Sequence, residues 1–340
     1  MKEKKVTDLG KDNIGGLLLK LALPAILAQI INVLYNMVDR MYIGHIPKIG
    51  SDALTGVGVT MPVIMAISAF AALVSMGGAP RASIMMGKND KSAAEKILGN
   101  CTLMLVIMAA ILTCVFFIWG EDILLVFGAS SKTIGYALEY MRIYSLGTIF
   151  VQLALGLNAF INAQGYAKMG MFTVAIGAIC NIILDPIFIF QFSMGVKGAA
   201  LATIISQGIS SVWVVYFLIS KKSTLKIKLK NLKPDRKVIV PCLALGLSPF
   251  IMQFTESVIS VCFNIKGTSN VDEAIESTNE FTALIEALKK ADESLEYVIE
   301  FLAEKEQEID QIVSQKMQDV TSDFNESMTS FTQQVNAAVI

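Results

Sequence analysis

Long apolar stretches fill most of residues 14–264 and limit the possible folds more than any other feature. A membrane-spanning helix needs about 20 mostly apolar residues. Stretches of this kind lie near 16–44, 54–80, 97–119, 136–161, 168–191, 197–220 and 238–264. Over the whole chain 54% of residues are hydrophobic and only 17% are charged, which is more apolar than a soluble domain of this size. The sequence therefore predicts an all-α, polytopic membrane helix bundle surrounded by a lipid bilayer.

Basic residues collect on alternate sides of these stretches. One side receives residues 1–13, the segment 81–96, Lys168 and the loop 221–237, whereas the other receives only Lys48, Lys132 and Lys197. Cytoplasmic loops carry the excess of Lys and Arg. We therefore expect a cytoplasmic amino terminus at 1–13, a basic cytoplasmic loop at 221–237 and a location in the cell inner (plasma) membrane. Acidic lipid headgroups account for the basic loop, so no nucleic-acid partner is expected.

The composition changes abruptly after residue 264. Residues 265–340 contain 5 Lys and Arg against 16 Asp and Glu, whereas residues 1–264 contain 23 against 13. Apolar residues in the acidic segment recur at steps of three and four, the pattern of a coiled-coil helix. The segment 265–340 is therefore predicted to be an acidic, amphipathic helical tail outside the cytoplasm. Its apolar stripe predicts that the segment folds back on itself, self-associates or has a coiled-coil partner.

Two aspartates within the apolar stretches are candidate functional residues. Asp39 follows Tyr35 by four residues, and Asp185 follows Asn181 by four, so each pair shares one helix face. Ionisable residues inside a bilayer are costly and usually line a cavity or an ion pathway. A buried carboxylate can bind and release a proton or coordinate a hard cation. The structural alternative is that Asp39 pairs with Arg40, and that Asp185 completes a helix end before a proline.

Sequence features of enzymes are missing. The chain has neither a phosphate-binding glycine loop nor a nucleophile elbow, and its one histidine, His45, makes no metal cluster. Its five cysteines lie in apolar stretches without ligand spacing. We therefore expect no enzyme, no cofactor and no metal beyond a possible sodium ion. Pro24 lies inside the first stretch, where it allows a helix bend.

Several ordered motifs resemble one family. LALPAILAQIINVLYNMVDRMYIGHI, GKNDKSAAEKILGN, LNAFINAQGYAKMGM, NIILDPIFIF and GVKGAALATIISQ together resemble the amino-terminal lobe of multidrug and toxic compound extrusion (MATE) transporters. The similarity is to the MepA-like and DinF-like branch and extends over about residues 10–264. It implies a six-helix lobe at 14–220, and it implies that 238–264 is the first helix of a second, truncated lobe.

The resemblance also implies a function and a site. Family members are cation-coupled antiporters, driven by protons or sodium, that export cationic apolar drugs. The implied cation site comprises Tyr35, Asp39, Asn158, Asn181, Asp185 and Thr203, and Glu256 falls where the second lobe can carry a carboxylate. With a truncated second lobe, this chain is expected to be incomplete or inactive alone. The alternatives are a membrane-anchored interaction protein, or a chimera, that displays an extracytoplasmic coiled coil, and an artificial product without function.

Overall fold

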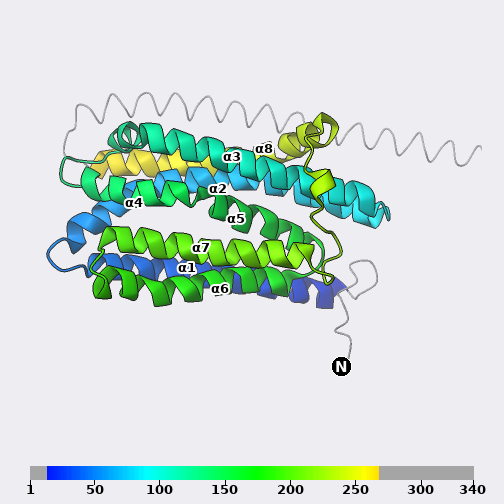
Figure 1. Cartoon of the computed structure of the whole chain (residues 1–340), viewed down its shortest axis with the longest axis horizontal. Helices are drawn as coiled ribbons and strands as arrows, with labels where there is room; N and C mark the ends of the chain where they lie inside the picture. Colours follow the sequence, from blue (N-terminus) through cyan, green and yellow to red (C-terminus); the bar gives the residue numbers. More distant parts are fainter. Residues whose placement is uncertain (1–13, 268–340) are drawn as a thin grey trace, which may run out of the picture. The chain divides into compact units, whose positions relative to one another are not determined.

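The computed structural model describes residues 14–267, which are almost entirely helical and belong to one compact unit (Figure 1). The predicted cytoplasmic segment 1–13 lies outside the described residues. Nearly all of the predicted tail 265–340 also lies outside the described residues, so the predictions of a coiled coil and of a chimera remain predictions. The predicted boundary at residue 264 is not a helix end, because the last described helix continues to Gly267.

The described helices follow the predicted apolar stretches closely. Their bounds are α1 Ile14–Gly44, α2 Gly50–Gly87, α3 Lys91–Val126, α4 Ile134–Leu146, α5 Thr148–Ala163, α6 Ala167–Pro186, the π-helical turn η1 Ile187–Gln191, α7 Val196–Ile219, the 3-10 turn η2 Leu229–Asn231 and α8 Arg236–Gly267. Within residues 14–267, 6 helices are long and apolar enough to cross a membrane, or 7 if α4 and α5 form one span. The prediction of a polytopic helical membrane fold is confirmed for this part of the chain.

Two predicted spans differ from the observed helices in ways that have physical causes. The stretch 136–161 is broken at Gly147, where α4 and α5 meet at a bend of 59°. A Cβ at Gly147 would lie 2.4 Å from the Ile204 side chain, so the absence of a side chain lets the break approach α7. Helix α3 begins at Lys91, before the predicted residue 97, because the Asp90 carboxylate caps it by accepting from the Ala93 N–H at 2.9 Å.

The crossing of α2 and α8 is a close backbone contact. A Cβ added at Gly77 would lie 1.8 Å from the Cys242 carbonyl oxygen, and one added at Gly246 would lie 1.8 Å from the Leu73 carbonyl oxygen. Nearer the start of α2 and the end of α8, the Ser257 hydroxyl donates to the Pro62 carbonyl oxygen at 2.6 Å. Small residues allow helices to approach this closely inside a membrane, where packing and hydrogen bonds replace the hydrophobic effect. Gly77 and Gly246 thus determine where α8 lies on α2.

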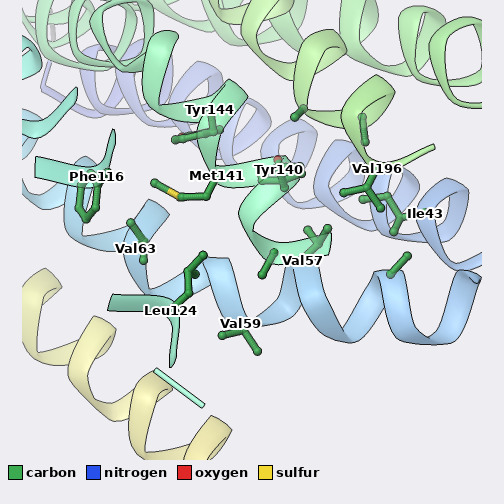
Figure 2. Packing of buried hydrophobic residues seen from close by; sticks show 14 of the residues in the cluster. Ile43, Val57, Val59, Val63, Phe116, Leu124, Tyr140, Met141, Tyr144 and Val196 are labelled. Atoms are coloured by element: carbon green, nitrogen blue, oxygen red, sulfur yellow. The ribbon is translucent and has the colours of Figure 1, made fainter. Parts of the chain in front are cut away.

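The interior of the bundle is filled by apolar side chains from several helices. Figure 2 shows Val63 of α2 close to Met141 of α4, with Phe116 of α3 beside it, and Val57 of α2 below Tyr140 of α4. Outward-facing side chains are also apolar, as is expected of a surface that contacts lipid hydrocarbon. Because both the interior and the outer surface of the bundle are apolar, the polar side chains inside it are exceptions and are candidates for a functional role.

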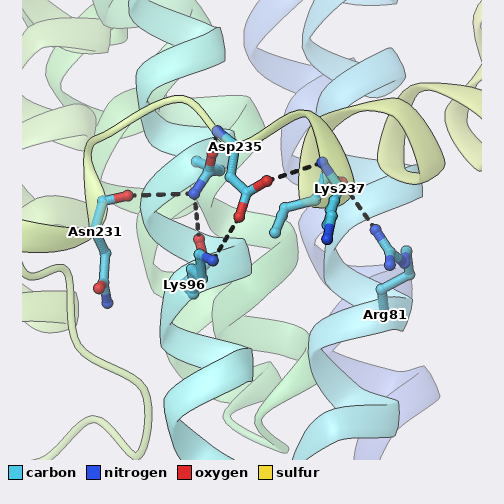
Figure 3. Close-up of polar contacts among 7 residues, drawn as sticks. Arg81, Lys96, Asn231, Asp235 and Lys237 are labelled. Carbon is cyan, nitrogen blue, oxygen red and sulfur yellow. Dashed lines mark hydrogen bonds and ion pairs between the residues drawn. The ribbon is translucent and has the colours of Figure 1, made fainter.

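A polar network holds the loop before α8 against α3 (Figure 3). The Lys96 ammonium pairs with the Asp235 carboxylate at 2.5 Å, and the Asp235 N–H donates to Asn100 Oδ1 at 2.8 Å. The Lys228 ammonium pairs with the buried Glu95 carboxylate. The hydrogen bond from Lys96, followed by that from the Lys237 N–H, holds the pKa of Asp235 below its ordinary value of 3.8. The basic loop is thus attached to α3 by two ion pairs, Lys96–Asp235 and Lys228–Glu95, and by the hydrogen bond to Asn100.

Candidate functional site

The structure brings Asp39 and Asp185 together, although they lie 146 positions apart in the chain. Asp39 lies in the second half of α1 and is only 6% exposed, and Asp185 lies at the end of α6 and is fully buried. Their carboxyl groups lie close enough to interact with each other by hydrogen bonding and electrostatics. Because an ionised carboxylate carries only acceptors, a hydrogen bond between them forms only when one of the two groups holds a proton. The pair is therefore a place that can hold a proton between α1 and α6.

Polar side chains from four helices surround the aspartate pair. The Asn181 amide donates from Nδ2 to Asp185 Oδ1 at 3.2 Å and to Thr203 Oγ1 of α7 at 3.4 Å. Thr203 also shares a hydrogen bond with Tyr140 of α4. Tyr35, one helical turn before Asp39, is close enough to both carboxylates to interact with them electrostatically. Of the six residues implied by the resemblance, the structure thus gathers five: Tyr35, Asp39, Asn181, Asp185 and Thr203.

Several buried oxygens of this cluster lack a hydrogen-bond donor within residues 14–267. They include Asp39 Oδ1, Asp185 Oδ2 and Asn181 Oδ1. Buried acceptors without donors are costly unless something positive satisfies them. Carboxylate and amide oxygens suit a proton or a hard cation such as sodium. Among the same residues there is no group of three or more His, Cys, Asp or Glu side chains that could hold a metal ion, so a transition-metal site has no support.

A cavity of about 830 Å³ lies next to the aspartate pair. Its walls include Tyr35, Asn181 and Thr203 but not Asp39 or Asp185, so these side chains separate the carboxylates from the cavity. Apolar side chains such as Met61, Ile64 and Leu155 line much of the rest. Ligand pockets typically combine an apolar lining with a few polar groups in this way. The geometry therefore offers a space for an apolar molecule beside a buried acidic pair.

The remaining predicted residues have separate positions. The Asn158 amide donates to the Gly170 carbonyl oxygen at 3.3 Å, so Asn158 joins α5 to α6 and lines the cavity. Glu256 lines the cavity from α8 and is exposed. Pro24 is buried, and α1 continues through it. Arg40 lines the cavity and interacts electrostatically with Asp39, although the two form no ion pair within 4.0 Å in the described part of the chain.

Two tyrosines of α4 belong to this site and were not predicted from the sequence. Tyr140 and Tyr144 are both buried, and their rings stack with centroids 6.0 Å apart. Tyr140 reaches Thr203, and Tyr144 lines the cavity. Their spacing of four residues was the available signal, because it repeats the one-turn spacing of Tyr35 with Asp39 and of Asn181 with Asp185. Because the bend at Gly147 was not predicted from the sequence, the orientation of these tyrosines toward the site could not be predicted either.

The fold and the site together define a multi-pass membrane protein with a buried acidic pair behind the wall of a polar and apolar cavity. The family model MatE matches residues 24–187, which include Tyr35, Asp39, Asn158, Asn181 and Asp185. The amino-terminal part of this chain belongs to the MATE family.

Curated relatives and solved structures agree with this family. The Multidrug export protein MepA of Staphylococcus haemolyticus (strain JCSC1435) is 25% identical over 265 residues, which cover 78% of this chain and 58% of the relative. A structure described as the inward-facing conformation of a multidrug resistance MATE family transporter of the MOP superfamily is 25% identical, with a TM-score of 0.66 over 74% of this chain and 59% of that one. An outward-facing structure of such a transporter, 22% identical, shares the fold with a TM-score of 0.67 over 86% and 73% of the chains.

This chain spans 58% of the length of the curated relatives. The names of these relatives describe export and transport, which agrees with the prediction that the chain is not an enzyme.

Proposed function

We propose that residues 14–267 bind the coupling cation of a multidrug antiporter and form part of its drug-binding cavity. The observation that carries this proposal is the buried contact between Asp39 and Asp185, with Asn181 and Thr203 beside it. Acidic residues buried in a membrane domain typically bind transported ions or relay protons. The contact also joins two helices, α1 and α6, so a cation bound there affects how these helices pack.

The coupling ion in this proposal is a proton or a sodium ion. A proton shared by the two carboxyl groups closes the contact, and its loss leaves two negative charges facing each other in apolar surroundings. A sodium ion would instead take the carboxylate and amide oxygens that lack donors. In either case the binding of a positive charge holds α1 and α6 together, and its release weakens that contact.

The proposed substrates are small, apolar, cationic drugs. The cavity combines an apolar lining with the Glu256 carboxylate and the amides of Gln29, Asn158 and Gln253. The carboxylate attracts a cation, and the apolar walls favour an organic one. The name of the relative MepA, a multidrug export protein, supports the same substrate class. Because Tyr35 and Asn181 line both the cavity and the aspartate site, a drug and a coupling cation affect each other there.

We further propose that the protein lies in the plasma membrane with its amino terminus in the cytoplasm. The support is the distribution of basic residues, since the segment 81–96 and the loop 221–237 lie on the same side as the amino terminus after an even number of crossings.

A binding experiment on the purified chain tests the proposed function. Tetraphenylphosphonium, an apolar cation, should bind to the chain in lipid nanodiscs, and sodium or acid should weaken its binding. Asp39→Asn or Asp185→Asn keeps the shape but removes the charge, so the cation should lose its effect on drug binding. The affinity for the coupling cation should fall about tenfold or more, since a buried hydrogen bond to a charged group contributes about 1.5–3 kcal/mol.

The matched control is Asp52→Asn, because Asp52 is exposed in the first turn of α2 and outside the cavity lining. This control should behave like the parent. If the double variant Asp39→Asn/Asp185→Asn responds to sodium and acid as the parent does, the two aspartates are structural and the proposal is wrong.

A further inference from the structure

Two buried cysteines from different helices lie against each other on the side of the bundle formed by α2, α3 and α8. Cys101 belongs to α3 and Cys242 to α8, and both are 0% exposed. Their thiol groups lie close enough to interact with each other electrostatically. This contact is separate from the aspartate site, which lies among α1, α4, α6 and α7.

Helix α2 positions both cysteines by means of two adjacent glycines. A Cβ at Gly78 would lie 2.5 Å from Cys101 Sγ, and a Cβ at Gly77 would lie 1.8 Å from the Cys242 carbonyl oxygen. Any larger residue at either position would therefore displace α3 or α8. The two sulfur atoms meet because α2 has no side chain at the point where α3 and α8 approach it.

A cationic group also faces this thiol pair. The Arg81 guanidinium donates from Nη1 to Cys242 Sγ at 3.2 Å and to the Val238 carbonyl oxygen at 2.9 Å. Figure 3 shows Arg81 reaching from α2 toward the start of α8. Cysteines that react as nucleophiles typically have a Lys, Arg or protonated His beside the sulfur. Cys242 is buried, unlike most reactive cysteines, but it has the cationic neighbour of one and a second thiol beside it.

From this geometry we propose that Cys101 and Cys242 are a redox modification site that forms a reversible disulfide and joins α3 covalently to α8. Hydrogen peroxide serves as the oxidant. The Cys242 sulfur attacks one peroxide oxygen, the O–O bond breaks, and the products are a sulfenic acid and one water molecule. The Cys101 sulfur then attacks the Cys242 sulfur, the S–O bond breaks, and the proton from Cys101 leaves with the hydroxide as a second water molecule.

The consequence of the disulfide is a covalent tie across the loop 221–237. Cys101 lies before this loop and Cys242 after it, so the bond would hold α8 on the bundle even if the loop were cut. Disulfides in proteins that face a reducing compartment are usually transient and regulatory. Exposure to thiol reductants should therefore reverse the bond. The proposal depends only on the contact among α2, α3 and α8 and not on transport.

A cut in the loop makes the bond visible. Lys233 and Pro234 are exposed, so the recognition sequence of a site-specific protease can be inserted between them. The purified chain is treated with hydrogen peroxide, its remaining thiols are alkylated, and the chain is cleaved. Without reductant the two fragments should migrate together at the mass of one chain, and with reductant they should separate. Mass spectrometry should identify the joined Cys101 and Cys242 peptides, lighter by two hydrogen atoms than the reduced pair.

Single variants assign the bond. Cys101→Ser and Cys242→Ser should each abolish the linked product, whereas Cys114→Ser, at an exposed position further along α3, and Cys262→Ser should retain it. Arg81→Gln should slow its formation several-fold, and an unchanged rate would overturn the role assigned to Arg81. Linked fragments that persist in Cys101→Ser would overturn the proposal. Fragments that stay separate without reductant, under peroxide that fully oxidises Cys114, would also overturn the proposal. That result cannot be explained by misfolding of a cysteine variant, because all five cysteines are still present.

Discussion

The contact of α2 with α8 and the contact of α1 with α6 use different kinds of atoms. On α2 and α8, glycines bring backbone against backbone, and the Ser257 hydroxyl satisfies a carbonyl oxygen at 2.6 Å. On α1 and α6, two carboxyl side chains meet, and several oxygens around them have no donor within residues 14–267. The first contact has no room for another atom. The second contact has, among the described residues, oxygen acceptors without hydrogen-bond donors, which is the arrangement that a bound cation requires.

The largest expected effect is on the free energy of unfolding and concerns the close contact of α2 with α8. Gly246→Ala places a methyl group 1.8 Å from a backbone oxygen of Leu73, and backbone cannot rotate away as a side chain can. We expect the free energy of unfolding to fall by about 3 kcal/mol, at the upper end of the usual cost of overpacking. Gly77→Ala should have a similar effect. Thermal unfolding in detergent at a fixed scan rate measures it.

Two other glycines are the controls. Gly177→Ala in α6 brings the new methyl group 2.5 Å from Ser210 Oγ, the end of a short side chain that can change rotamer, so it should cost about 1 kcal/mol or less. Gly58→Ala in α2 meets no atom within 4 Å and should stabilise its helix by up to about 1 kcal/mol. Equal melting temperatures for the Gly246, Gly177 and Gly58 variants would mean that α8 does not depend on the glycine contact.

A smaller effect is expected at the contact of α1 with α6, where we propose that the cation binds. Thr203→Val preserves the shape of the side chain but removes the hydroxyl that bonds Asn181 and Tyr140. We expect a loss of about 1 kcal/mol in unfolding free energy, the usual net contribution of a hydrogen bond. Stabilisation by sodium or acid should fall as well, because Asn181 loses a partner that orients it. Both quantities can be read from thermal unfolding with and without the cation.

The control for Thr203 is Thr55→Val. Thr55 is exposed, and its hydroxyl bonds only to the Ser51 carbonyl oxygen of its own helix, at 3.0 Å. This variant should change the melting temperature little and should leave the cation response as it is in the parent. A Thr203 variant that keeps the full cation response would remove Thr203 from the proposed site.

The smallest effect concerns the loop that precedes α8. The folded-state pKa of Asp235 lies below its ordinary value of 3.8, mainly because Lys96 donates a hydrogen bond to it. The contribution of Asp235 to stability is therefore fully present above that ordinary value and is lost as the pH falls through the lower folded-state pKa. Asp235→Asn should have a slightly lower melting temperature than the parent at neutral pH, with no difference in strong acid.

High salt should also reduce the difference between Asp235→Asn and the parent, because the Lys96–Asp235 pair is partly exposed and is screened by ions. A difference in melting temperature that stays constant from neutral pH to strong acid would show that Asp235 acts by shape and not by charge.

The sequence was most informative where a single rule applied. Hydrophobic stretches of spanning length predicted the helices, and the one-turn spacing of Tyr35 with Asp39 and of Asn181 with Asp185 predicted two polar helix faces. That these faces meet was implied by the family resemblance and not by the spacing, because no local pattern reports which helices are neighbours. The structure adds that the carboxylates lie behind the cavity wall.

Other features could not be predicted because they depend on residues distant in the chain. Lys96 and Asp235 lie 139 positions apart, and charged residues of this kind mark only the end of a span in a hydropathy pattern. The break at Gly147 looked like the middle of one apolar stretch, since Ile204, the side chain that requires a glycine there, comes from α7. For the same reason Tyr140 was not recognised as a neighbour of Thr203.

The glycine crossing of α2 and α8 also has a mechanical consequence. Two helices in close backbone contact over about one turn, at Gly77 and Gly246, can tilt about that turn more easily than they can slide. From Gly246 to Gly267, α8 extends about 30 Å, at about 1.5 Å per residue. A tilt of about 10° at the crossing would move the far end of α8 by about 5 Å and Ser257 by about 3 Å. The Ser257–Pro62 hydrogen bond would break, while the crossing itself would hardly change. Because Gly246 lies about a third of the way along α8, a small change of angle at the crossing moves the far end of the helix by several ångströms.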